Sequence, residues 1–117
     1  MTKSIVFFNH LSSWVITLIL TNSKPKHRAR MYERFMYIAQ HLRQLNDYET
    51  LYAVTSGMRD TSVQRLSQTH QLVQVAPSVA KEFQGYVKLF DPGGGYAHYR
   101  RALQANVSNG QAAIPLM

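Results

Sequence analysis

The side chains suited to acid–base, metal or nucleophilic chemistry lie far apart along this sequence. No two of the five histidines have the spacing that places a pair of metal ligands on one helix face: His10, His27, His41, His70 and His98. Asp47 and Glu49 are close together, but acidic residues at the start of a predicted helix are explained by its dipole. The sequence has no cysteine and no G-x-S-x-G or Walker motif. We therefore expect no covalent catalysis, no metal site and no cofactor.

Two further stretches could bind a phosphate or another anion. The glycines at 93–95 precede a predicted helix, whose free N–H groups could hold a phosphate. No strand precedes them and no Gly-Lys-Ser/Thr follows, so a turn between helices is the favoured interpretation. The second stretch is a basic cluster within 24–34 that lacks interleaved stacking aromatics: Lys24, Lys26, His27, Arg28, Arg30 and Arg34. We interpret it as a solvated helix face and expect no nucleic acid, with a nucleic-acid or anionic-lipid surface as the alternative.

The overall charge of the chain favours acidic partners. Lys and Arg number 13 against 6 Asp and Glu, which gives a net charge of +7 and a pI of about 10.0. Such a balance suits an acidic protein face, an anionic membrane or a nucleic acid without choosing among them. At 117 residues and 45% hydrophobic residues, the chain is long and apolar enough for one folded domain.

The most apolar stretch, residues 5–20, is predicted to be a buried helix. It is short for a membrane span and carries Asn9 and His10 where a span or a signal peptide must be apolar. We therefore expect no transmembrane segment. Together with the lack of cysteine, this favours a cytoplasmic location, and recruitment to the inner face of the plasma membrane stays open.

Helical periodicity dominates the chain and predicts an all-α, irregular array of about six helices. Proline, asparagine and glycine mark the breaks, and the predicted helices cover 4–20, 25–45, 48–58, a short stretch from 61 to 66 that could extend to 73, 77–90 and 96–107. The second of these has one apolar stripe at three- and four-residue steps: Met31, Phe35, Ile38, Ala39, Leu42 and Leu45.

Six segments, in order and spacing, resemble the catalytic domain of Ras-type guanine-nucleotide exchange factors. They are 8–15 (FNHLSSWV), 35–46 (FMYIAQHLRQLN), 53–58 (AVTSGM), 62–66 (SVQRL), 95–100 (GYAHYR) and 114–115 (IP). The chain departs from the family where Asp47-Tyr48 replaces Asn-Phe and where Gly95 replaces Asn. The resemblance covers nearly the whole chain.

This resemblance implies an all-α domain that binds the switch regions of a Ras-like small GTPase and promotes GDP release without covalent chemistry. The positions that it implies as GTPase contacts are Tyr52, Thr55, Ser56, Met58, Arg59 and Tyr96. Met58 and Tyr96 have an alternative interpretation as packing residues. A non-catalytic module that docks a GTPase or a scaffold is the alternative function.

The resemblance also implies that residues 1–117 are the central part of a domain about twice this length. The family's N-terminal helices and its C-terminal helical hairpin, which opens the nucleotide site, are expected outside this sequence. We therefore expect these 117 residues alone to exchange nucleotide poorly or not at all, and to leave apolar helix surface uncovered.

Overall fold

The structure, a computed structural model, describes residues 3–91 and 96–115. Within these two ranges the chain forms α1 (Lys3–Leu20), α2 (Pro25–Gln44), α3 (Tyr48–Met58), α4 (Thr61–Gln64), α5 (Ser67–Leu72), α6 (Pro77–Leu89) and α7 (Ala97–Ser108). The described residues contain no strand, only an isolated parallel bridge between Asp47 and Ile114. The prediction of an all-α fold is confirmed. Three glycines that we considered for phosphate binding, at 93–95, lie outside the described residues.

The described part of the chain has seven helices where about six were predicted. The additional element arises because the stretch after Asp60 is two short helices, α4 and α5. Leu66 separates them with φ −80° and ψ 70°, which is not a helical conformation. The prediction of a short helix from 61 to 66 is close to α4, but residues 67–72 were considered only as its extension and not as a helix of their own.

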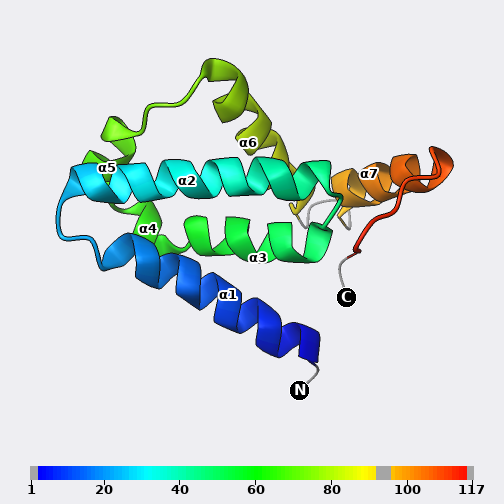
Figure 1. The fold of residues 1–117 in the computed structure, drawn as a ribbon, viewed down its shortest axis with the longest axis horizontal. Helices are drawn as coiled ribbons and strands as arrows, with labels where there is room; N and C mark the ends of the chain where they lie inside the picture. Colours follow the sequence, from blue (N-terminus) through cyan, green and yellow to red (C-terminus); the bar gives the residue numbers. More distant parts are fainter. Residues whose placement is uncertain (1–2, 92–95, 116–117) are drawn as a thin grey trace.

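α2 and α3 lie side by side and run in opposite directions, and α1 crosses beneath them (Figure 1). The turn between them is short because Asn46 adopts a left-handed conformation with φ 58°, which asparagine tolerates. Asp47 then caps α3 by accepting a hydrogen bond from the Thr50 backbone N–H at 3.1 Å. These two residues explain why the boundary between the predicted helices is accurate.

The core consists of two clusters that meet on α2 and α3. The first joins α1 to α2, α3 and α6 through side chains such as Val15, Phe35 and Met58. The second joins α3 to the end of α6 and to α7 through Tyr48, Leu51 and Tyr99. α3 therefore connects the two halves of the molecule.

The predicted apolar stripe of α2 is partly wrong. The buried residues of α2 are Ala29, Tyr32, Phe35, Met36 and Ala39. Ile38 is 41% exposed and Leu45 is 71% exposed, although both were assigned to the stripe. Tyr32 takes a core position because its ring packs edge-on against His70 at 5.0 Å and Phe83 at 6.2 Å, on α5 and α6. The buried face is therefore set by neighbours on both sides of α2.

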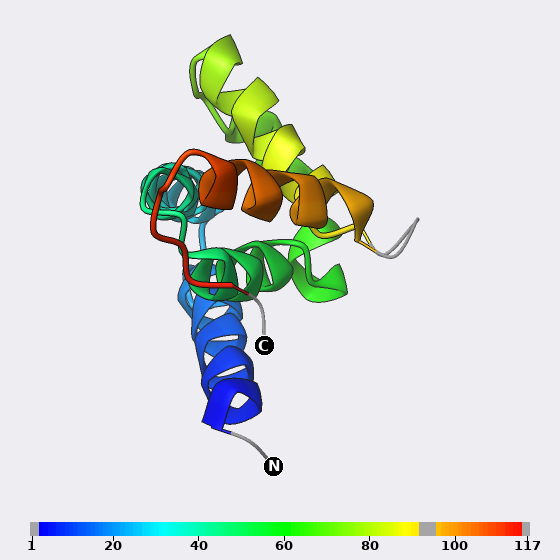
Figure 2. The same ribbon diagram turned by 90° about the vertical axis from the view of Figure 1, so that its right-hand side faces the viewer.

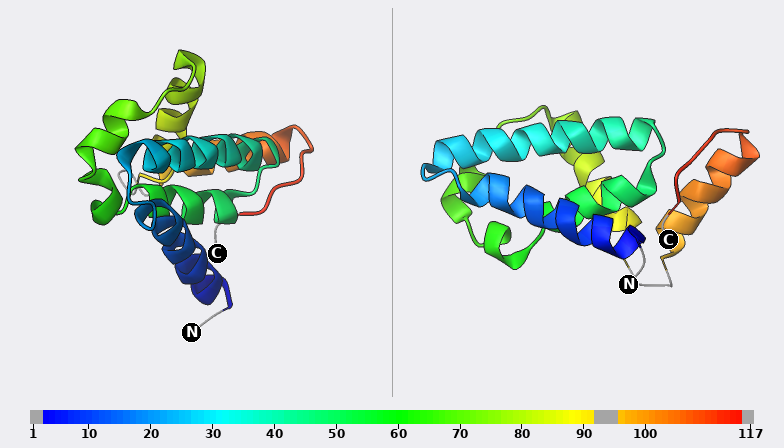
Figure 3. Two further views of the ribbon diagram at one scale, coloured as in Figure 1. Left: turned by 60° about the vertical axis from the view of Figure 1, so that its left-hand side comes forward. Right: turned by 60° about the horizontal axis from the view of Figure 1, so that its bottom comes forward.

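The segment after α7 returns to the turn between α2 and α3 (Figure 3). The Tyr48 N–H donates to the Ile114 carbonyl and the Ile114 N–H donates to the Asn46 carbonyl, each at 2.8 Å. The Tyr48 hydroxyl also bonds to the Asn106 side-chain oxygen of α7, and both residues are buried. α7 and residues 111–115 are thus fixed to the first residue of α3.

None of the helices in the described ranges combines the length and the apolar character that crossing a bilayer would need.

Candidate functional site

Aromatic side chains from four parts of the chain meet around Tyr52 on α3. The Tyr52 ring lies 5.0 Å from the ring of Phe8 on α1 and 4.8 Å from that of Phe90 at the end of α6. Tyr96, the residue before α7, packs against the same group. We call these four residues, Phe8, Tyr52, Phe90 and Tyr96, the Tyr52 cluster. Phe90 is buried, while the other three are partly exposed and offer an aromatic surface.

Burial raises the pKa of the Tyr52 phenol, and the neighbouring Tyr96 raises it further through electrostatic repulsion and a hydrogen bond. A raised pKa keeps the phenol protonated and neutral at physiological pH. Tyr52 can therefore present a neutral aromatic ring to a partner, while its hydroxyl is engaged in the hydrogen bond with Tyr96.

Tyr96 has an unusual backbone conformation. Its φ of 62° and ψ of 40° are left-handed, which is uncommon for a residue with an aromatic side chain. Such a conformation costs free energy, so surrounding contacts must hold it. The contact with Tyr52 is one of them.

Three of the residues implied as contacts form a line along the accessible side of α3. Tyr52, Ser56 and Arg59 are separated by four and three residues, so they lie on one face of the helix. Tyr52 and Ser56 are partly exposed, and Arg59 is exposed and makes no salt bridge within residues 3–91 and 96–115. With Tyr96 beside Tyr52, this line is the candidate interface.

Thr55 and Met58, which the resemblance also implies as GTPase contacts, lie on the buried side of α3, away from this line. Met58 is completely buried in the first core cluster. Thr55 is 3% exposed, and its hydroxyl donates to the Leu51 carbonyl at 2.9 Å. Both residues follow the spacing of Leu51 and Val54, which face the other helices. For Met58 the interpretation as a packing residue holds in this arrangement.

Phe8 and Phe90 belong to the cluster but were not predicted as site residues. A sequence pattern cannot bring them to Tyr52, because Phe8 is 44 positions and Phe90 is 38 positions away along the chain. Two features of the sequence could have drawn attention to them. Phe8 is the first residue of the segment 8–15 that resembles the family, and Phe90 is the last apolar residue of the predicted helix 77–90.

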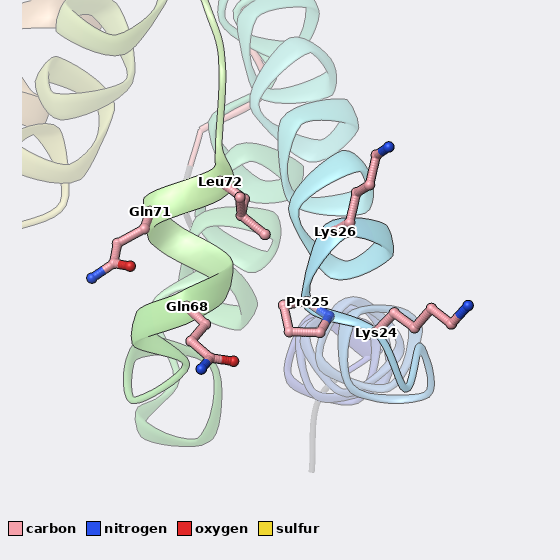
Figure 4. Close-up of a pocket in the computed structure, with 6 residues that line it drawn as sticks. All are labelled: Lys24, Pro25, Lys26, Gln68, Gln71 and Leu72. Carbon is pink, nitrogen blue, oxygen red and sulfur yellow. The ribbon is translucent and has the colours of Figure 1, made fainter.

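Among the hollows on the surface of the described residues, two stand out, and neither resembles an enzyme active site. One, of about 420 Å³, lies between the start of α2 and α5 and is lined by Lys24, Pro25, Lys26, Gln68, Gln71 and Leu72 (Figure 4). The other, of about 590 Å³, lies on α7 and is lined by Ala97, Arg100, Arg101, Gln104, Ala105 and Ser108. No group of three or more potential metal ligands occurs among the described residues. The exposed line on α3 therefore remains the stronger candidate, as a protein-binding surface.

The described residues form an all-α domain in which α3 presents a mixed aromatic and basic surface. The RasGEF domain family matches residues 1–117, and the chain belongs to this family.

Individual relatives agree with the family match. Ras guanine nucleotide exchange factor A of Dictyostelium discoideum is 37% identical over 102 residues, covering 87% of this chain and 16% of the relative. Ras guanyl-releasing protein 3 of Homo sapiens is 34% identical over 100 residues, covering 86% of this chain and 14% of the relative. Ras guanine nucleotide exchange factor P of Dictyostelium discoideum is 33% identical over 116 residues, covering 98% of this chain and 7% of the relative. The chain thus spans 16% or less of the length of these relatives, and the resemblance to Ras exchange factors is confirmed.

Proposed function

We propose that this chain is part of an exchange domain that binds a Ras-like small GTPase and promotes release of its GDP. The observation that carries the proposal is the accessible line of Tyr52, Ser56 and Arg59 on α3, with Tyr96 beside it. It lies within a chain that matches the RasGEF domain along its whole length. A partly buried aromatic group next to an arginine is typical of the centre of protein interfaces.

The mechanism is one of differential binding, in which no covalent bond is made or broken. A surface that binds the nucleotide-free GTPase more tightly than the loaded form must weaken nucleotide binding by the same factor. In this proposal Tyr52 and Tyr96 are aromatic anchors, and Arg59 supplies an exposed positive charge at the edge. Thr55 and Met58 support α3 from behind, where they pack against the core.

The first prediction concerns preference between nucleotide states. In a pull-down with an immobilised Ras protein, we expect the chain to bind the nucleotide-free form in preference to the GTP-loaded form. Tyr52→Ala should weaken that binding by about thirtyfold or more, the effect of losing an interface anchor worth about 2 kcal/mol. Arg59→Glu should weaken it as well, because it reverses the charge at the edge.

Matched variants separate loss of contact from loss of fold. Tyr37→Ala truncates another tyrosine, which is 43% exposed on α2, and should leave binding unchanged. Arg65→Glu reverses an exposed arginine at the end of α4 and is the control for Arg59→Glu. Helix content by circular dichroism should stay constant throughout. Equal binding of both nucleotide states would favour a docking or scaffold module instead, and unchanged binding of Tyr52→Ala would mean that another face is used.

The second prediction concerns catalysis by the 117 residues alone. We propose that residues 1–117 are the central part of the domain, and that the flanking helices and the hairpin known in the family complete it. With a fluorescent GDP analogue on a Ras protein, micromolar chain should leave the release rate close to the spontaneous rate. A large acceleration would contradict this, because the described helices would then suffice to open the nucleotide site.

We further propose that the domain acts in the cytoplasm and is recruited to the inner face of the plasma membrane. The support is the net charge of +7, which favours contact with anionic surfaces. Exchange activity and the GTPase contact do not depend on this recruitment.

A further inference from the structure

The outward side of α2 is a basic and apolar face that the GTPase proposal leaves unused. α2 contacts α1, α3, α5 and α6, and its remaining side faces solvent. Figure 2 looks along α2, which lies at the left edge of the molecule. α1 and α3 lie below α2 in this view, and α6 and α7 extend from it toward the right. The residues of this outward face are Lys26, His27, Arg30, Arg34, Tyr37, Ile38, His41 and Leu45. At 100° per residue they cover a sector about 120° wide, opposite the buried residues.

The first half of this face is positively charged. Lys26, His27 and Arg34 are exposed, and Lys24 stands immediately before the helix. Both lysine ammonium groups point to the same side, away from Gln68, Gln71 and Leu72 of α5 (Figure 4). Arg28 is not part of this outward set, because its guanidinium is directed to the Thr69 hydroxyl and the Asn22 carbonyl, to each of which it donates at 3.0 Å. The predicted basic cluster therefore divides into one structural arginine and an outward set.

No exposed acidic residue neutralises the outward face of α2 from within the helix. Glu33 is the one acidic residue of α2, and its side chain is 12% exposed. Its carboxylate pairs with Arg30 and accepts a hydrogen bond from the Gln74 backbone N–H at 2.6 Å. Glu33 therefore links α2 to the segment after α5. Arg30 consequently adds less to the field than Lys24, Lys26 and Arg34.

The second half of the same face is apolar and exposed. Tyr37 is 43% exposed, Ile38 41% and Leu45 71%. A nucleic acid would pair with the cations but would leave these aliphatic side chains in water. At a bilayer surface, by contrast, lysine and arginine meet the headgroups while tyrosine and aliphatic side chains enter the interface.

We propose that the outward face of α2 is a peripheral membrane-binding surface. Its basic half binds the headgroups of anionic phospholipids, and Tyr37, Ile38 and Leu45 enter the bilayer interface. This surface shares no residue with the Tyr52 cluster or with the line on α3. The two proposed surfaces are therefore separate, and each is testable without the other.

The test is sedimentation of the 117-residue chain with vesicles of phosphatidylcholine, with or without phosphatidylserine. We expect binding only when phosphatidylserine is present, with steep weakening by salt. The double variant K24Q/K26Q should lower binding by about thirtyfold, since each lysine near an anionic surface contributes about a fivefold factor. K81Q/K88Q removes the same charge from exposed positions of α6 and should leave binding nearly unchanged.

A second pair of measurements tests the apolar half of the face. I38Q/L45Q keeps the charge and should lower binding to the anionic vesicles by about tenfold, while binding to heparin stays the same. The proposal is overturned if K24Q/K26Q and K81Q/K88Q lose vesicle binding equally, which would indicate net charge alone. It is also overturned if I38Q/L45Q binds anionic vesicles like the unsubstituted chain, if a single-stranded RNA binds more tightly than the vesicles, or if the chain does not sediment with anionic vesicles. Circular dichroism at each step verifies that the helices are intact.

Discussion

Replacing Tyr48 with alanine is expected to lower the free energy of unfolding by about 4 kcal/mol, the usual cost of removing a buried aromatic ring. Tyr48 is completely buried at the start of α3, and its ring meets the Tyr99 ring of α7 at 5.3 Å. Its hydroxyl bonds to Asn106, which would lose that partner in the core. Urea unfolding followed by circular dichroism measures the change.

The conservative variant Tyr48→Phe divides this effect into two parts. It keeps the ring and removes the hydroxyl, so the expected loss is about 1–2 kcal/mol from the unpaired Asn106 oxygen. Because Tyr48 holds α7 and Tyr96 precedes α7, Tyr48→Ala should also weaken GTPase binding more than Tyr48→Phe does. If the alanine and phenylalanine variants were equally stable, the ring would not be part of the core.

Gly57→Ala is the second substitution for which we expect a large loss, of about 3 kcal/mol. α1 and α3 cross closely at this residue. A Cβ atom at position 57 would lie 2.7 Å from the Ser12 carbonyl oxygen and 2.8 Å from the Val15 Cβ. Neither is the end of a flexible side chain, so the helices themselves must separate. Thermal unfolding in parallel with the unsubstituted chain measures the loss.

Gly85→Ala is the matched control for Gly57→Ala. Gly85 is also within a helix, α6, but a Cβ atom there would meet nothing within 4 Å. Alanine should therefore stabilise the chain by about 0.5–1 kcal/mol, because it has the higher helix propensity. Two glycine-to-alanine changes of opposite sign would establish that close packing of α1 on α3 causes the difference. A stabilising Gly57→Ala would contradict that packing.

The helices could be predicted from the sequence because their ends carry local signals. Pro25 starts α2 and Asp47 caps α3, and both boundaries depend on the residues themselves. The short helix from 61 was predicted to end at Leu66 or to extend to 73, so α5 was not predicted as a separate helix. Local signals mark the ends of α2 and α3, whereas we find no such signal for the start of α5, which has no side-chain cap.

The faces of the helices were harder to predict than their ends. Ile38 and Leu45 resemble core residues in sequence but lie on the side of α2 that no helix covers. Met58 matched a family contact position, yet the described arrangement buries it. A periodic pattern identifies which residues share a face. Only the packing of neighbouring helices decides whether that face is inside or outside.

The pairing of Ile114 with residues 46–48 has a consequence for the order of folding. The two hydrogen-bonded segments are about 66 residues apart in the sequence. The hydrogen bond from the Asn46 side chain to the Ala112 carbonyl, for example, spans 66 residues. At 5–20 residues per second, a ribosome needs on the order of several seconds to deliver that partner. During this interval the Tyr48 amide is left to water, and α1, α2 and α3 can collapse first. Docking of α7 is then expected after the packing of α1, α2 and α3, because it requires a long loop to close.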